Sequence, residues 1–455
     1  MSDIRVNRWL HQSGTGGVYQ DSTGRVGIGT SVPTSALDVQ SGTIKIGSNT
    51  LSSSGVSTFT TVNTTTLNST TVTATTITGV TTAGITTAYI GAVNDGPLSG
   101  FRNKIINGDM RVDQRNNGAS VSVTGDGFGN RQFPVDRFNI QKNSTCVISG
   151  IQTSDVPTGQ GFSNALRAQV TTADATIAAG DYAFISHRFE GYNVADLHYG
   201  TTNAKTATLS FWVKSSISGT YCVSISNYAD NRAIPINYSI NSPDTWEYKT
   251  ITISGDTTGT WEKTSSGGMN MSWTLGAGTD YQATNNIWTG SIELATSSQT
   301  QWISTLNSTF FITGVQLEAG TVATPFERRS FGQELALCQR YCFVEDNDDG
   351  SGGYGSYRWF AYGHTDSTTT ATVCRFFPVK MRMAPSGTIS NQTHFITDRG
   401  QGATTLTALS VSGFTTPFSA RLLCTVASGL TAGQPTALAS DGTLSRRYII
   451  YNAEL

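Results

Sequence analysis

The chain has 455 residues, enough for about two to four ordinary domains. Charged residues make up 13% of it, and 29 basic against 31 acidic residues leave a net charge of −2. This balance excludes a broadly basic protein held to nucleic acid or lipid by bulk electrostatics, and it argues against a charge-swollen disordered chain. Abundant Gly, Thr, Ser and Asn are typical of a β-rich protein. The sequence shows neither a signal peptide nor a long apolar span, so we expect synthesis in the cytoplasm.

The first 22 residues are too short to hold a core of their own. They mix charges with apolar residues and a glycine-rich hinge at 14–17. We predict that this segment folds against a partner protein, and an expression remnant is the alternative. The predicted contact residues are Ile4, Val6, Trp9 and Leu10.

A threonine-rich stretch dominates residues 23–100. No charged side chain occurs between 46 and 94, and 15 of the 31 residues from 60 to 90 are Thr. Apolar residues recur at steps of five, interrupted once by a step of three, at Leu67, Val72, Ile77, Val80, Ile85 and Ile90. Short strands with a turn in each repeat cannot bury such residues alone. We predict a β shaft intertwined in a homotrimer around this apolar core, with a disordered linker as the alternative.

Residues 101–328 have the pattern of a β-sandwich or jelly roll. Strand-like runs are predicted at 121–124, 138–141, 207–214, 221–226, 247–254, 269–275 and 310–316. Trp212 and Trp246 lie within these patterns, and we interpret both as core residues.

One helix is predicted within residues 329–343. Ser330 and Gln333 fit a capping box. An apolar stripe follows at steps of four, three and four, formed by Phe331, Leu335, Cys338 and Cys342. We expect this stripe to pack against its symmetry mates in a trimer. Residues 344–455 return to strand patterns and form a second β domain, with a last strand near 448–452.

Neither a metal nor another cofactor is expected. The six cysteines lack zinc or redox spacing, and we interpret them as buried thiols in a reducing compartment. The acidic run 345–350 imitates the start of a calcium loop, but its twelfth position is Ser356 instead of Glu. We expect a solvated acidic turn there, and calcium held in another geometry stays open.

Several segments together resemble phage tail fibres. The segments are 24–30 (GRVGIGT), 35–39 (SALDV), 103–110 (NKIINGDM), 133–138 (FPVDRF), 210–215 (SFWVKS), 246–250 (WEYKT), 312–318 (ITGVQLE), 323–328 (ATPFER), 334–341 (ELALCQRY) and 451–455 (YNAEL). The first two are similar to a module near the start of fibre shafts, and those from 103 to 341 resemble a carbohydrate-binding-like jelly roll.

The resemblance implies a homotrimeric receptor-binding protein of the virion. Its N-terminus would attach to a phage tail, adaptor or baseplate protein. Its C-terminal domains would bind a host cell-surface polysaccharide or an outer-membrane receptor. No nucleic-acid partner is expected.

Aromatic residues crowd one part of the predicted C-terminal tip domain, where they could stack on a sugar. The candidate receptor-binding residues are Tyr354, Tyr357, Trp359, Tyr362 and His364. Strand alternation would place Tyr357 and Trp359 on one face and Phe360, Tyr362 and His364 on the other. Burial of both faces is the alternative.

An enzyme is not expected. Glycoside hydrolysis needs two carboxylates at a set separation, and nothing in the sequence pairs Asp136, Asp181 or Glu190. No hydrolase, zinc-protease or phosphate-loop motif occurs. A polysaccharide depolymerase and a purely structural spacer are the alternatives to a receptor binder.

Overall fold

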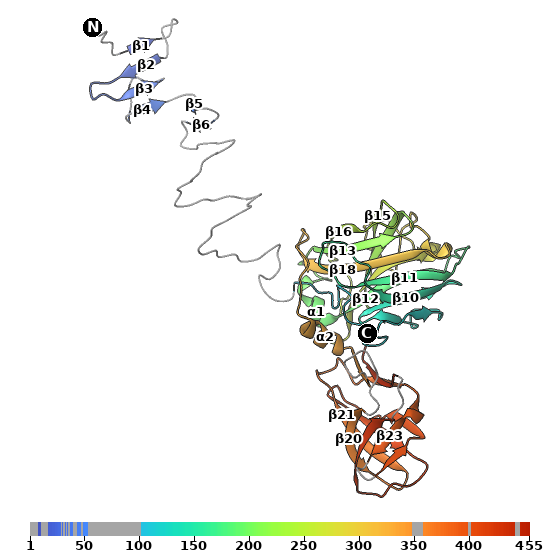
Figure 1. Cartoon of the computed structure of the whole chain (residues 1–455). Coiled ribbons are helices and arrows are strands. Elements are labelled where there is room, and N and C mark those ends of the chain that lie inside the picture. The colour runs from blue at the N-terminus through green and yellow to red at the C-terminus, as the bar shows by residue number, and fades with distance from the viewer. Residues whose placement is uncertain are drawn as a thin grey trace. The chain divides into compact units, whose positions relative to one another are not determined.

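The computed structural model describes residues 8–10, 17–28, 30, 32, 34, 37–39, 43–46, 49–52, 102–347, 358–398, 402–441 and 446–455. Contacts divide the chain into two units, residues 1–88 and 89–455. The described part is almost entirely β-structure (Figure 1), which confirms the all-β prediction. No helix among the described residues has the length and apolar character needed to cross a membrane.

The first unit contains a small four-stranded sheet. Its strands are β1 (Arg8–Leu10), β2 (Gly17–Gln20), β3 (Val26–Ile28) and β4 (Leu37–Val39), and β5 (Thr43–Ile46) pairs with β6 (Asn49–Ser52) in a separate hairpin. Asp21 closes the turn between β2 and β3, because its Oδ1 accepts hydrogen bonds from the backbone N–H groups of Thr23 and Arg25 at 2.9 Å. The predicted boundary at residue 22 thus falls between two paired strands.

The predicted attachment and shaft residues lie largely outside this described part. Trp9 and Leu10 belong to β1, whereas Ile4 and Val6 are not among the described residues. All six apolar residues of the predicted shaft core, from Leu67 to Ile90, also lie outside the described residues.

The second unit begins with a β-sandwich of two antiparallel six-stranded sheets. The β18 sheet has the order β16 (Glu247–Ile253), β13 (Ala207–Ser215), β18 (Thr309–Ala319), β11 (Ala165–Thr172), β10 (Val147–Thr153) and β7 (Val121–Val123). The β17 sheet has the order β15 (Ala233–Ile240), β14 (Gly219–Asn227), β17 (Gly267–Ala277), β12 (Tyr182–Glu190), β9 (Phe138–Asn143) and β8 (Gln132–Val135). All seven predicted strands are present.

Alternation along the strands builds the sandwich core. Met269, Met271 and Trp273 of β17 point into it, as do Phe211 and Val213 of β13. The residues between them face away from the core, since successive side chains of a strand point to opposite faces. The side chains on the outer face of each sheet are therefore not constrained by the core and can differ between the two sheets.

Helical elements are few and short in the described part. They are α1 (Gly191–Val194), α2 (Phe331–Gln339), and the 3₁₀ turns η1 (Ala195–Leu197), η2 (Thr279–Tyr281), η3 (Trp302–Ser304) and η4 (Gln392–His394). The predicted capping box of α2 is confirmed, with both Ser330 and Gln333 bonds present.

The prediction that the apolar stripe of this helix extends to Cys342 is wrong. The helix stops at Gln339, and Cys342 opens strand β19 (Cys342–Asp346) instead. Cys338 is fully buried among residues of its own chain, including Ile106 and Leu455, whereas Phe331 is exposed. The stripe is therefore divided between the chain's own core and the surface.

The C-terminal domain, residues 342–455, packs two sheets around a second core. The larger sheet has the order β24 (Ala403–Thr405), β23 (Phe395–Asp398), β27 (Pro435–Ser440), β20 (Trp359–Thr365), β21 (Thr370–Phe376), β26 (Ser419–Thr425) and β25 (Ala408–Val411). In the smaller sheet, β28 (Tyr448–Asn452), the predicted last strand, lies between β19 and β22 (Ser386–Ile389). Five cysteines are buried as predicted, but Cys374 of β21 is exposed.

A buried ionic cluster joins the C-terminal domain to the sandwich. The Glu454 carboxylate contacts the Arg137 guanidinium and lies 3.1 Å from Nη2 of Arg115. Arg137 is 1% exposed in its side chain and also stacks on Tyr341, 3.6 Å from the ring centre. The Tyr341 hydroxyl donates to Glu190 of β12 at 2.8 Å. Segments that carry the fibre resemblance thus meet at this junction.

Replacement of Glu454 tests how much this junction contributes to the stability of the fold. We expect Glu454→Ala to lower the free energy of unfolding by about 3–5 kcal/mol, because it leaves the buried Arg137 guanidinium without its counter-charge and leaves Arg115 with Asp136 alone. Urea denaturation measures the loss. The exposed acid Glu262 supplies the matched control, Glu262→Ala, with a change within about 0.5 kcal/mol. Equal midpoints for the two variants would contradict the assigned role.

The described part of the acidic run, residues 345–347, is not solvated as the sequence predicts, and residues 348–350 lie outside the described residues. Glu345 and Asn347 are buried, and Glu345 Oε1 lies 3.0 Å from Nη2 of Arg375. Asn347 Oδ1 accepts the backbone N–H of Arg447 at 2.7 Å. Burial raises the pKa of the Glu345 carboxyl to about 7, although Arg375 opposes the shift. Among the described residues, no cluster of His, Cys, Asp or Glu could hold a metal ion.

This raised pKa predicts a pH-dependent stability. The folded state binds a proton at Glu345 more tightly than the unfolded state does. The free energy of unfolding therefore falls as the pH rises from the ordinary glutamate pKa of 4.5 to the raised pKa of about 7. Between pH 5 and pH 8 we expect this residue to contribute a loss of about 2 kcal/mol. Glu345→Gln removes that contribution, and denaturant titrations at both pH values measure it. An unchanged pH slope in the variant would refute the prediction.

Candidate functional site

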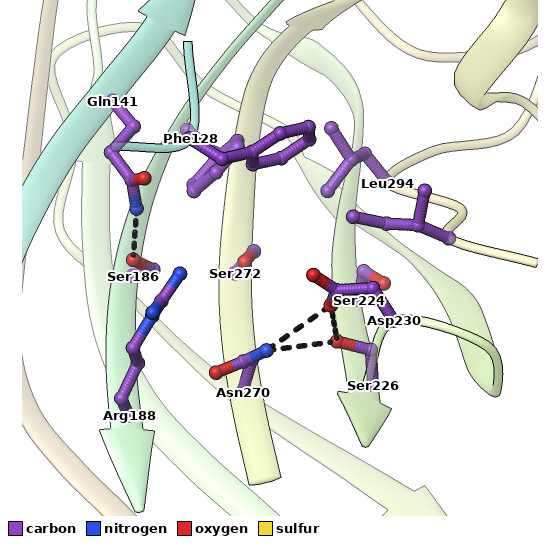
Figure 2. Close-up of a pocket in the computed structure, with 12 residues that line it drawn as sticks. Phe128, Gln141, Ser186, Arg188, Ser224, Ser226, Asp230, Asn270, Ser272 and Leu294 are labelled. Atoms are coloured by element: carbon purple, nitrogen blue, oxygen red, sulfur yellow. Dashed lines mark hydrogen bonds between the residues drawn. The ribbon is translucent and has the colours of Figure 1, made fainter. Parts of the chain in front are cut away.

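The outer face of the β17 sheet carries a polar groove (Figure 2). Ser224 and Ser226 of β14, Asn270 and Ser272 of β17, and Ser186 of β12 all point to this face. Each alternates along its strand with a core residue, as in the run 269–274 (MNMSWT). Strand alternation therefore concentrates hydroxyl and amide groups on one side of the sheet.

Two buried amide oxygens in this groove have no hydrogen-bond partner, Oε1 of Gln141 and Oδ1 of Asn270. The two residues are 0% and 8% exposed, respectively. Their NH₂ groups are engaged: Gln141 donates to Ser186 Oγ at 3.3 Å, and Asn270 donates to Asp230 Oδ1 at 3.3 Å. A buried acceptor left without a partner costs about 1–3 kcal/mol, so both oxygens favour a ligand that donates hydrogen bonds.

Apolar residues from two loops wall the groove. Phe128 stacks on Tyr182 with ring centres 4.4 Å apart, and Ile292 and Leu294 also line the groove. The segment around residue 294 is anchored to the sheet, because Thr274 Oγ1 donates to the Leu294 backbone oxygen at 2.5 Å. The site thus combines apolar walls with a polar floor.

Arg188 and Asp230 give the groove one charge of each sign. Burial, together with neighbouring Arg131, lowers the pKa of Arg188 to about 10. Burial also raises the pKa of Asp230, which Ser226 and Arg188 partly oppose. Asp230 lies in the turn after β14 with a φ of 54°, and its Oδ1 accepts a hydrogen bond from Ser226 Oγ at 3.2 Å. Figure 2 shows Arg188 and Asp230 on opposite sides of Asn270.

This groove is not among the sites predicted from the sequence. Its signal is present, since small polar residues alternate with apolar ones in β9, β12, β14 and β17. Such alternation is typical of any half-exposed sheet. What distinguishes this face is that Ser186, Ser226 and Ser272 are buried, which strand alternation alone does not predict.

The predicted aromatic residues of the C-terminal domain are partly brought together. Trp359 and Tyr362 are 46% and 67% exposed, and their rings lie nearly parallel with centres 6.5 Å apart. His364 is exposed on the same strand and lies 3.1 Å from Asp366. Tyr354 and Tyr357 lie outside the described residues.

The predicted alternation on this strand is wrong. A register shift between Trp359 and Ala361 makes Phe360 and Ala361 both buried, so Trp359 and Tyr362 are both exposed. A bulge of this kind adds a residue and changes which side chains share a face. The aromatic pair is therefore a second candidate surface for a sugar.

Trp212 and Trp246 are not core residues, contrary to the prediction. Both are half-buried outside the sandwich core. Trp212 stands on the outer face of the β18 sheet beside Tyr248, and Trp246 donates from its indole N–H to Asp155 at 3.2 Å. In β13 the inward positions are taken by Phe211 and Val213, so Trp212 must face outward.

Comparisons with known proteins find similar folds at low identity. No family model matches the chain, and no curated protein matches its sequence. A tailspike enzymatically active domain of bacteriophage CBA120 is similar over 49% of this chain and 22% of its own, with 14% identity and a TM-score of 0.28. A family 11 carbohydrate-binding module from Clostridium thermocellum is similar over 45% of this chain and 98% of its own, with 13% identity and a TM-score of 0.24. A putative sugar-binding protein from Bacteroides thetaiotaomicron is similar over 48% of this chain and 99% of its own, with 12% identity and a TM-score of 0.24.

Proposed function

We propose that the groove of the β17 sheet binds a glycan of the host cell surface. The observation that carries the proposal is the pair of buried, unpartnered oxygens of Gln141 and Asn270. Sugar hydroxyl groups are donors as well as acceptors, so they satisfy these oxygens and also bond to the serine hydroxyls and Asp230. Phe128 and Leu294 supply the apolar contact that a sugar ring needs on its C–H face.

The size of the groove limits how the sugar enters. Its enclosed part holds about 20 Å³, which is room for one water or one hydroxyl group. A sugar therefore inserts one edge between Gln141 and Asn270 while its ring lies across the opening. This geometry favours the side of a polysaccharide chain over recognition of a whole buried ring.

Replacement of Asn270 tests the groove. We expect the wild-type chain to bind members of a printed array of bacterial surface polysaccharides. Asn270→Ala should weaken the strongest of these interactions by about five- to thirtyfold in calorimetric titration, because it removes one unpartnered acceptor and one donor. Binding at wild-type strength would contradict the proposal.

The aromatic pair of the C-terminal domain supplies the matched control. Trp359→Ala truncates an exposed side chain far from Asn270 in sequence, on a strand that packs around another core. If the groove binds the glycan, this variant retains wild-type affinity on the same array. Loss of binding in Trp359→Ala alone would assign the receptor site to the C-terminal domain instead.

We further propose that the chain works as a homotrimeric phage tail fibre. The residue segments quoted above support this proposal, as does the charge-free stretch 46–94, since parallel copies cannot place like charges side by side. The N-terminal segment would attach to a tail, adaptor or baseplate protein of the virion. Three copies would multiply a weak glycan contact through avidity.

Sedimentation equilibrium of the full chain tests the trimer. We expect a mass of three chains at micromolar concentration. Deletion of residues 53–100 should shift the mass toward one chain, because it removes the predicted shaft core. A wild-type monomer would refute the trimer without affecting the groove.

We propose binding without cleavage. Asp230 is the one carboxylate among the described residues that line the groove, whereas glycoside hydrolysis commonly uses two. Asp136 is held by Arg115 at 3.4 Å, and Glu190 by Arg340 and Tyr341.

A reducing-end assay on the polysaccharides bound by the array tests this absence of cleavage. We expect no release of reducing ends above a buffer control. Release that is lost in Asp230→Asn would assign catalysis to the groove and overturn the proposal.

A further inference from the structure

A second pocket lies on the outer face of the other sheet of the sandwich. It encloses about 370 Å³, within the usual range for small-ligand sites. Trp212 of β13 and Tyr248 of β16 are direct cross-strand partners there, with ring centres 5.3 Å apart. Phe162 and Phe326 form an edge-to-face pair at 5.2 Å on the pocket wall. Four aromatic rings thus surround one space.

A glycine in left-handed conformation shapes this pocket. Gly314 has a φ of 62° and lies where β18 shifts register against β13, between the partners of Ser210 and Trp212. A Cβ at Gly314 would approach the Phe162 ring to 2.6 Å and the Trp212 ring to 3.1 Å. The absence of a side chain at this bulge is therefore what lets both rings approach the sheet.

One cation lines the pocket, and its neighbours there are neutral. Arg328 lies over the Phe162 ring at 4.7 Å and donates to the backbone oxygens of Gly161 and Gln160 at 2.7 and 2.6 Å. No acidic side chain lines this pocket among the described residues, so Arg328 has no counter-charge within the pocket itself. The positive charge is thus held in place by backbone and rings, with N–H groups left over for a ligand.

We propose that this pocket binds a sugar ring that carries a carboxylate, such as a uronic acid. The C–H face of the ring stacks on Trp212 and Tyr248, as apolar sugar faces do on aromatic rings. The carboxylate pairs with the Arg328 guanidinium, whose planar donors match its two oxygens. The volume accommodates one such ring with its substituents.

The pocket is separate from the groove of the proposed function. It is built by β13, β16 and β18, whereas the groove is built by β9, β12, β14 and β17, so the two belong to different sheets. The chemistry also differs, because the groove has hydroxyl and amide groups on its floor and the pocket has aromatic rings. A substitution in one is therefore not expected to alter binding in the other.

Saturation-transfer NMR on the full chain tests the pocket with methyl glucuronide and methyl galacturonide, each against its neutral methyl glycoside. We expect the wild-type chain to transfer saturation to at least one of the acidic sugars. Transfer to the corresponding neutral methyl glycoside should be weaker. Trp212→Ala and Tyr248→Ala should each weaken binding of the acidic sugar at least about tenfold. Arg328→Gln should abolish the preference for the acid while neutral binding persists.

The outcomes separate this pocket from the groove. Asn270→Ala should bind the acidic sugars as the wild type does. Tyr248 is 45% exposed, so Tyr248→Ala is expected to fold even if Trp212→Ala does not. Failure of the wild type to bind either acidic sugar, or equal binding by Tyr248→Ala, would overturn the proposal. Loss of acidic-sugar binding in Asn270→Ala alone would assign that ligand to the groove.

Discussion

The contact of one carboxylate with two buried guanidinium groups is the constraint on which the second unit depends. Arg137 is held in the turn between β8 and β9 with a φ of 69°, and Arg115 precedes β7. A buried charge is costly in an apolar environment without a partner. Glu454, which follows β28 of the C-terminal domain, supplies the partner of Arg137 and shares Arg115 with Asp136. The two cores are thereby joined through electrostatics. The same turn directs β9, whose Gln141 reaches the floor of the groove.

The two outer faces of the sandwich show how one architecture produces different chemistry. Both sheets bury one face in a common core, so the other face is free to vary. On the β17 sheet, small polar side chains are buried, and the amide oxygens of Gln141 and Asn270 have no hydrogen-bond partner. On the β18 sheet, a glycine bulge lets aromatic rings lie close to the strands. Loops and one irregularity thus add to what the strands place on each face.

Local patterns were the predictable part of the structure. The strands of the sandwich, the last strand and the capping box of α2 follow from alternation and capping, which are encoded in neighbouring residues. The helix end was not predictable, because Cys342 is drawn into β19 by its pairing with Asn452. Nor was the burial of Glu345, which depends on Arg375 from another strand. The sequence spacing of Trp359 and Tyr362 could not reveal the bulge that makes both exposed.

The strand order has a consequence for how the chain is made. In each of the four sheets of the second unit, a late strand lies between strands synthesised earlier: β18 between β11 and β13, β17 between β12 and β14, β28 between β19 and β22, and β27 between β20 and β23. None of these sheets can close until its late strand leaves the ribosome. Until then the flanking strands present open edges, which are templates for pairing with other chains. Each sheet is thus protected from aggregation only when its own late strand has emerged, which happens by Ala319 in the sandwich and only after Pro435 in the C-terminal domain.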